Sequence, residues 1–131
     1  MQLAHKAGIE KALIDVAILD VPSIGLAAQA IRLVKEEFGL PVGGAPSNAI
    51  LAWKHVKEFG DYAGRLCSAG SAVIMQSLGA NFIFYGPIAK SVEVFPACAM
   101  ADAIIAYAMK RHGIKPRTKN HHFTKYFKSV C

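Results

Sequence analysis

Apolar residues gather in three short stretches, and each stretch ends in small or polar residues, a proline and then a helical pattern. The stretches cover residues 16–21, 40–44 and 81–85. Nearly continuous apolar runs of this length, above all the third, are typical of parallel strands buried on both faces. Because helical spacing follows each run, strand and helix alternate along the chain. The pattern therefore predicts an α/β fold with parallel strands.

The apolar positions between these stretches recur at the spacing of one helix face. After the first strand they fall at Ile24, Ala27, Ala28, Ile31, Val34 and Phe38, behind Ser23 as a helix N-cap. We expect helices over residues 2–7, 23–38, 47–59, 61–78 and 96–113, the last one starting near Pro96. Glycine at or next to the end of each segment fits a helix C-terminus.

Polar side chains stand where the first two strands end. Asp20 lies at the C-terminal end of the first strand and Asp15 at its opposite end, while Asn48 follows the second strand. In barrels of parallel strands, the C-terminal edge carries function and the opposite edge carries stability. Asp20 and Asn48 are thus candidate ligands of a polar heterocycle, and Asp15 is an internal control. The alternatives are that Asp20 only caps the next helix and that Asn48 makes only local bonds.

The turn before Asn48 is rich in small residues, which permit close approach of a ligand or of a neighbouring backbone. We place Gly43 and Ser47 with Asp20 and Asn48 in the predicted substrate-binding set. No nucleotide-binding glycine motif is present. No metal-ligand spacing is present, since His121 and His122 have no cysteine or acid near them in the sequence. Cys98, just past Pro96, is either a thiol of lowered pKa at a helix start or a packed core residue.

The length of 131 residues is well short of the roughly 250 residues of a closed (β/α)₈ barrel. Three parallel strands leave two open edges, which invite another chain. The hydrophobic share of 53% also fits a chain that supplies only part of a larger hydrophobic core. We therefore expect a partial (β/α)₈ TIM barrel of about three C-terminal βα units. A missing N-terminal half-barrel or a second copy of the chain would complete it.

Charge divides the chain into residues 1–113, the expected barrel portion, and residues 114–131, a basic tail. The first segment has ten Lys/Arg and nine Asp/Glu, and the second has five Lys/Arg and no acid, giving +1 and +5. The tail is either a solvated end or a docking segment for an acidic partner or a membrane surface. Nucleic acid is not an expected partner, because the body has no basic stripe or aromatic platform.

The three scattered cysteines, Cys67, Cys98 and Cys131, argue against a disulfide framework and favour a reducing, cytoplasmic compartment. Residues 1–8 lack the apolar core of a signal peptide. The longest apolar stretch, residues 103–109, is far shorter than the ~20 residues of a membrane-spanning helix. We therefore expect no transmembrane segment.

Four strings of the sequence resemble the family of tetrahydromethanopterin S-methyltransferase H subunits. They are residues 18–25 (ILDVPSIG), 39–49 (GLPVGGAPSNA), 84–88 (FYGPI) and 94–97 (VFPA), the last with Asp102 and Ala103. The resemblance implies a pterin-binding barrel similar to methyltetrahydrofolate:corrinoid methyltransferases. It implies methyl transfer from N5 of methyl-tetrahydromethanopterin to a Co(I) corrinoid on a partner subunit. Coenzyme M is then the downstream acceptor.

Residue by residue, the resemblance implies that Asn48 contacts the pterin N5 as the catalytic group and that Asp20 binds the pyrimidine edge. It also implies a location at the periphery of a membrane-associated complex, without a metal ion of the chain's own. The earlier strands of such a barrel are absent from this sequence. Two other functions therefore stay open: a non-catalytic half-barrel assembly module, and a methyltetrahydrofolate:corrinoid methyltransferase relative.

Overall fold

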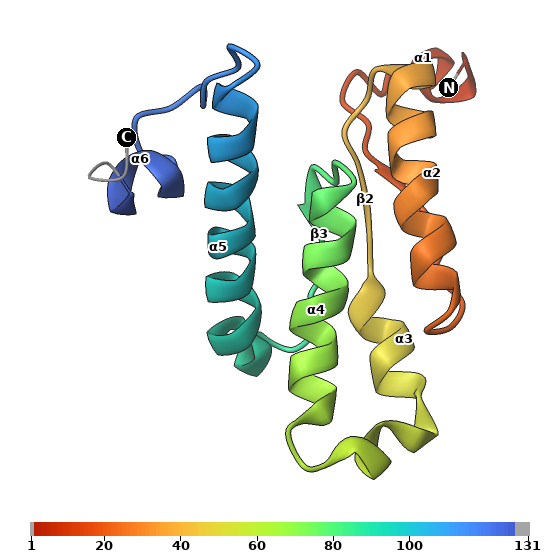
Figure 1. Ribbon diagram of the computed structural model, residues 1–131. Helices are drawn as coiled ribbons and strands as arrows, with labels where there is room; N and C mark the ends of the chain where they lie inside the picture. The colour runs from red at the N-terminus through yellow and green to blue at the C-terminus, as the bar shows by residue number, and fades with distance from the viewer. Residues whose placement is uncertain (1, 128–131) are drawn as a thin grey trace.

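A computed structural model describes residues 2–127 and shows three short parallel strands in one sheet, in the order β1-β2-β3 (Figure 1). The strands are β1 (Ile14–Asp15), β2 (Val42–Gly44) and β3 (Phe82–Ile83). The register pairs Ile14 with Val42 and Gly43 with Phe82. The predicted α/β class with parallel strands is confirmed.

The first strand was misplaced by the sequence pattern. Pairing covers Ile14 and Asp15 and extends only to Val16, whose N–H donates to the Gly43 carbonyl at 2.8 Å. Residues 17–21, predicted as strand, leave the sheet instead. The reason is that β2 ends at Gly44 and the chain turns into a helix at Pro46. Residues 17–21 therefore have no neighbouring strand with which to pair.

The helices are α1 (Gln2–Lys6), α2 (Ser23–Phe38), α3 (Pro46–Ala52), α4 (Ala63–Ser77), α5 (Ser91–Lys110) and α6 (His122–Tyr126), with 3₁₀ turns η1 (Lys54–Phe59) and η2 (Ile88–Lys90). Two boundaries differ from the prediction. The helix expected over 47–59 is broken by the extended backbone of Trp53. Helix α5 begins five residues before Pro96, which therefore removes one hydrogen bond inside the helix instead of starting it.

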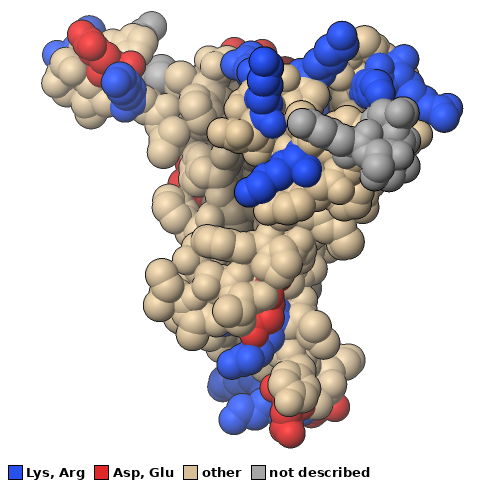
Figure 2. Space-filling model, turned by 90° about the vertical axis from the view of Figure 1, so that its left-hand side faces the viewer, with Lys and Arg blue, Asp and Glu red and all other residues tan. Residues whose placement is uncertain are grey.

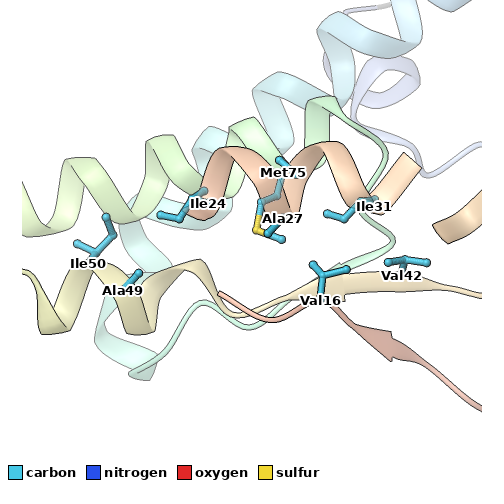
Figure 3. Close-up of a cluster of buried hydrophobic side chains, with 9 residues drawn as sticks. Val16, Ile24, Ala27, Ile31, Val42, Ala49, Ile50 and Met75 are labelled. Carbon is cyan, nitrogen blue, oxygen red and sulfur yellow. The ribbon is translucent and has the colours of Figure 1, made fainter. Parts of the chain in front are cut away.

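Helices α2 and α4 pack on one face of the sheet (Figure 1). Figure 3 shows the core between them, where Ile31 of α2 and Met75 of α4 meet Val42 of β2. All three side chains are fully buried. This layer is the largest hydrophobic cluster of the described residues, and it holds the strands against the helices.

The opposite face of the sheet is uncovered within residues 2–127. Along the first segment, Val16 is buried against the helices, whereas Leu13 and Leu19 are 63% and 85% exposed. On the third strand segment, Phe84 is 53% exposed. Along the first segment, this alternation is that of a strand buried on one side only, and both residues of β3, Phe82 and Ile83, are only half-buried. The prediction that the third strand is buried on both faces is therefore wrong for this chain.

Helix α5 lies along α4, where Val94 packs on Ala69 and Ala72. The segment from Ile88 to Lys110 is long and apolar enough to cross a membrane, in contrast to the sequence expectation. The early start of α5 supplies the extra length. Length and composition are weak evidence for a span, because core helices meet the same criteria.

The basic tail contains a helix that the sequence pattern did not predict. Helix α6 packs on α5, with the Phe123 and Tyr107 ring centroids 5.9 Å apart. His121 Nε2 lies 2.9 Å from a carboxylate oxygen of Asp102. The segment from His121 to Tyr126 is therefore held against the body by an aromatic contact and a polar one.

Gly43→Ala is expected to destabilise the fold by about 1–3 kcal/mol, because an added methyl group overpacks a filled site. A Cβ at Gly43 would lie 2.1 Å from the Phe82 carbonyl oxygen. The free energy of unfolding from urea titration, followed by circular dichroism, measures the effect.

The matched control is Gly70→Ala in α4, where an added Cβ meets no atom within 4 Å. That substitution is expected to stabilise by about 0.5–1 kcal/mol, since alanine favours a helix over glycine. Equal effects of the two substitutions would contradict the proposed close approach of β2 and β3.

Candidate functional site

The candidate site lies at the C-terminal edge of the sheet. Because the strands are parallel, residues 16–21, 45–48 and 84–87 all leave from the same edge. Asp20 and Asn48 thus lie at the same edge of the sheet, and both are exposed. Asp15, the intended control, pairs within the sheet opposite Gly43 instead of marking the far edge.

The segment that carries Asp20 is fixed by Ser23, the first residue of α2. Ser23 Oγ accepts hydrogen bonds from the backbone N–H groups of Leu19 and Asp20, both at 2.9 Å, and donates to the Asp20 carbonyl at 2.8 Å. In return, Asp20 Oδ1 accepts from the Ser23 N–H at 2.9 Å. The capping alternative for Asp20 is therefore observed for one carboxylate oxygen. Oδ2 makes no hydrogen bond to another described residue.

Ser47 joins the ends of the second and third strands. It is 1% exposed, and its hydroxyl donates to the Phe84 carbonyl at 3.2 Å. Gly86 beside it has a φ of 83°, and a Cβ there would lie 2.9 Å from Ser47 Oγ. Glycine thus provides both the left-handed backbone and the space that this contact requires. Ser47 does not cap α3, because that helix starts at Pro46 and the Ser47 hydroxyl bonds to the Phe84 segment instead.

Asn48 lies in the first turn of α3 beside Ser47, with its side chain in solvent. Its backbone N–H donates to the Ala45 carbonyl at 3.2 Å. Its amide group makes no hydrogen bond within residues 2–127, so the alternative of a side chain consumed by local bonds is not what the structure shows. An unengaged amide offers a ligand both donors and an acceptor.

Gly43, placed in the substrate-binding set by sequence, is buried in β2 against Phe82. Gly44 is equally buried, and a Cβ there would lie 3.0 Å from the Val16 carbonyl. The small residues of β2 thus permit the close approach of neighbouring backbone. This was one of the two alternatives, the other being the approach of a ligand. Gly43 and Ser47 position the edge of the sheet, while Asp20 and Asn48 are exposed on it.

A groove separates the Asp20 segment from α3 and η1. Its walls are Leu19, Asp20, Val21 and Pro22 on one side and Ala49, Ala52, Trp53, Lys54 and His55 on the other. Asn48 does not line this groove. Trp53, Lys54 and His55 were not singled out as functional residues by the sequence pattern. The signal that was available is that Trp53 is the chain's single tryptophan, in the helical segment that follows a predicted strand.

Two further titratable groups, Cys98 and Lys90, belong to the helix packing. Burial, and secondly the Asp102 carboxylate, raises the pKa of the Cys98 thiol. Of the two alternatives for Cys98, the lowered pKa is therefore wrong, and the packed core residue is the one that holds. Burial lowers the pKa of Lys90, although Glu93 opposes this effect. Lys90 Nζ donates to Ser68 Oγ at 2.9 Å and joins η2 to α4.

The sequence around His121 and His122 holds no nearby acid, but the fold brings one to both rings. Both rings contact the same oxygen of Asp102, His121 Nε2 at 2.9 Å and His122 Nδ1 at 3.4 Å. Over the described part of the chain, no three His, Cys, Asp or Glu side chains are arranged to hold a metal ion.

Comparison with known proteins supplies the family. A family model described as the tetrahydromethanopterin S-methyltransferase MtrH subunit matches residues 1–117. The H subunit of tetrahydromethanopterin S-methyltransferase from Methanothermobacter thermautotrophicus is 38% identical over 129 residues, which cover 95% of this chain and 41% of that protein. The Methanopyrus kandleri protein of the same name is 31% identical over 134 residues, covering 92% and 42%. The chain thus spans about two-fifths of the length of these relatives.

Ser47→Ala is expected to lower the free energy of unfolding by about 1–3 kcal/mol, because it removes the partner of the Phe84 carbonyl in a part-buried hydrogen bond. Urea titration measures the change. Ser77→Ala is the control, since that exposed hydroxyl only bonds back to Val73 in its own helix. The control is expected to stay within about 0.5 kcal/mol of wild type, and a similar loss in both variants would contradict the role given to Ser47.

Proposed function

Because the chain belongs to the tetrahydromethanopterin S-methyltransferase MtrH subunit family, we propose that it forms part of a pterin methyl-transfer site. The methyl group moves from N5 of methyl-tetrahydromethanopterin to the Co(I) of a corrinoid carried by a partner subunit. Coenzyme M is the final acceptor in a membrane-associated complex. The family match over residues 1–117 carries this proposal, and the name of the relatives supports the donor and the reaction class.

The three-stranded sheet is, in this proposal, one part of a (β/α)₈ barrel. Two features support it: helices cover only one face of the sheet, and the candidate polar residues stand at the C-terminal edge. Barrels place active sites at this edge. The chain covers about 41% of a relative, so the remaining strands and pterin ligands would come from outside this sequence.

Asn48 is the proposed catalytic group. When the methyl group leaves as an electrophile, the electron pair of the carbon–nitrogen bond returns to N5, and this nitrogen needs a proton or a strong hydrogen bond. An amide can donate to neutral N5 and accept from protonated N5. The free Asn48 amide at the sheet edge fits that task, and such preorganised groups stabilise developing charge best where water is excluded.

Asp20 is the proposed ligand of the pyrimidine edge of the pterin. Oδ1 is held by the Ser23 N–H, which fixes the carboxylate plane and leaves Oδ2 for a charge-assisted hydrogen bond from the ligand. Trp53 lies across the groove from Asp20 and offers an aromatic face for a flat ring. Ser47 and Gly43 act indirectly, by fixing the backbone that presents Asn48.

The runner-up within the same chemistry is a methyltetrahydrofolate:corrinoid methyltransferase relative, because the two pterins share the reactive ring end. Parallel assays with both methyl donors separate the two. In either case, we place the chain on the cytoplasmic side at the periphery of a membrane complex. The relatives' designation as one subunit of an enzyme supports the existence of partners.

Asn48→Ala is expected to lower the rate of methyl transfer to cob(I)alamin by about 10²–10³-fold, the loss typical of one transition-state hydrogen-bonding group. The assay uses a complete protein of a relative in which the matching segment is replaced by this chain. Asn120→Ala in the tail is the matched control. A wild-type rate for the Asn48 variant would remove Asn48 from the mechanism.

A second candidate function is a non-catalytic assembly module, favoured by the uncovered apolar face with Leu13, Leu19 and Phe84. In this case a second copy or a separate half-barrel covers that face. We expect self-association of the chain in sedimentation velocity, weakened about tenfold or more by Leu19→Glu, since apolar interface residues at the centre of a contact carry most of its energy.

Leu33→Glu, on the solvent side of α2, is the matched control and is expected to leave association unchanged. A chain that remains monomeric at all concentrations would speak against the assembly module.

A further inference from the structure

The exposed basic residues of the C-terminal part are here called the basic surface. It consists of Lys110, Arg111, Lys115, Arg117, Lys119 and Lys125, all exposed. Asp102 is the last acidic residue of the chain, so no acid follows in residues 103–131. Figure 2 views the molecule from the left-hand side of Figure 1. Blue side chains gather in the upper part of that face, above a middle part with few charged side chains. The field of the basic surface is thus not neutralised by acids of its own segment.

The cations of the basic surface have no acidic partners elsewhere in the described chain. The ion pairs of residues 2–127 employ Arg32 and Arg65 of the body and three histidines, but none of these six side chains. Four of the six line one open groove: Lys110, Lys115, Arg117 and Lys119, together with Thr118 and Thr124. Exposed ammonium and guanidinium groups with no acidic partner suit phosphate groups.

Exposed apolar side chains border the basic surface. They are Ile104 and Tyr107 of α5, Ile114 after it, and Tyr126 and Phe127 at the end of α6. Contacts between α6 and α5 hold the flanking aromatic residues in place. Cations beside exposed aliphatic and aromatic groups are typical of segments that lie on a membrane surface.

We propose that the basic surface docks this chain on an anionic phospholipid membrane, with lipid phosphate groups in the Lys110–Lys119 groove and the bordering apolar side chains in the headgroup region. The inference is independent of the methyl-transfer proposal, because the basic groove shares no residue with the groove beside Asp20. It gives the chain a direct contact with lipid in addition to any contact with partner subunits.

Vesicle flotation with the full 131-residue chain tests the proposal, since protein aggregates do not float. We expect the chain to float with phosphatidylcholine vesicles that contain phosphatidylglycerol and not with pure phosphatidylcholine. Binding should decrease as salt is raised, because exposed charges are screened beyond about 10 Å at 0.1 M ionic strength. The combined variant Lys115→Gln, Arg117→Gln and Lys119→Gln should bind about 100-fold more weakly.

The matched control removes the same charge from the body through Lys6→Gln, Lys11→Gln and Lys57→Gln, three exposed side chains. It should bind like wild type, and an equal loss would show that net charge alone acts, which overturns the proposed surface. Equal binding to neutral vesicles would overturn the electrostatic mechanism. Binding to poly-glutamate without binding to anionic vesicles would assign the surface to an acidic protein and overturn the lipid proposal.

Discussion

The close approach of β2 to its two neighbours is the constraint on which the structure depends. Gly43 lies against Phe82, and Gly44 lies against Val16 and Met75. Side chains at these two positions would push the strands apart, and the parallel pairing of only a few residues per strand would be lost. Because the pairing is so short, most of the holding energy must come from the helix layer, where Ile31, Val42 and Met75 are buried. The two glycines permit the close strand pairing, and burial of the core residues stabilises it.

Family membership and strand–helix order follow directly from patterns that local sequence carries. The alternation of apolar runs with helical spacing predicted the α/β class, and helix α2 was placed correctly at residues 23–38. Strand lengths could not be predicted in this way, because a residue is in a strand only if a neighbour exists to pair with it. Residues 17–21 have strand-like composition, yet β2 ends before it can reach them. Helix α6 was missed because its contacts with α5 are distant in sequence.

The candidate site was predictable in position but not in the roles of its parts. Asp20 and Asn48 stand at the expected edge of the sheet because parallel pairing puts every strand end on the same side. Sequence proximity grouped Gly43 and Ser47 with them, whereas their surroundings are the interior of the sheet and the Phe84 carbonyl. A hydroxyl or a glycine near a turn has many possible partners, and only the tertiary contacts select one. The groove beside Trp53 likewise depends on where two separate segments meet.

The hydrogen bond from Ser47 to Phe84 links segments that are 37 positions apart. It couples the start of α3 to the start of the loop that leads to η2. The segment beyond Phe84 leads through η2 into α5, the helix that holds α6. A displacement of the backbone after β3 therefore also displaces Ser47, the residue before Asn48. A displacement of Ser47 likewise moves the backbone after β3. The position of the Asn48 backbone is in this sense tied to a residue of the following βα unit, while its amide group stays in solvent.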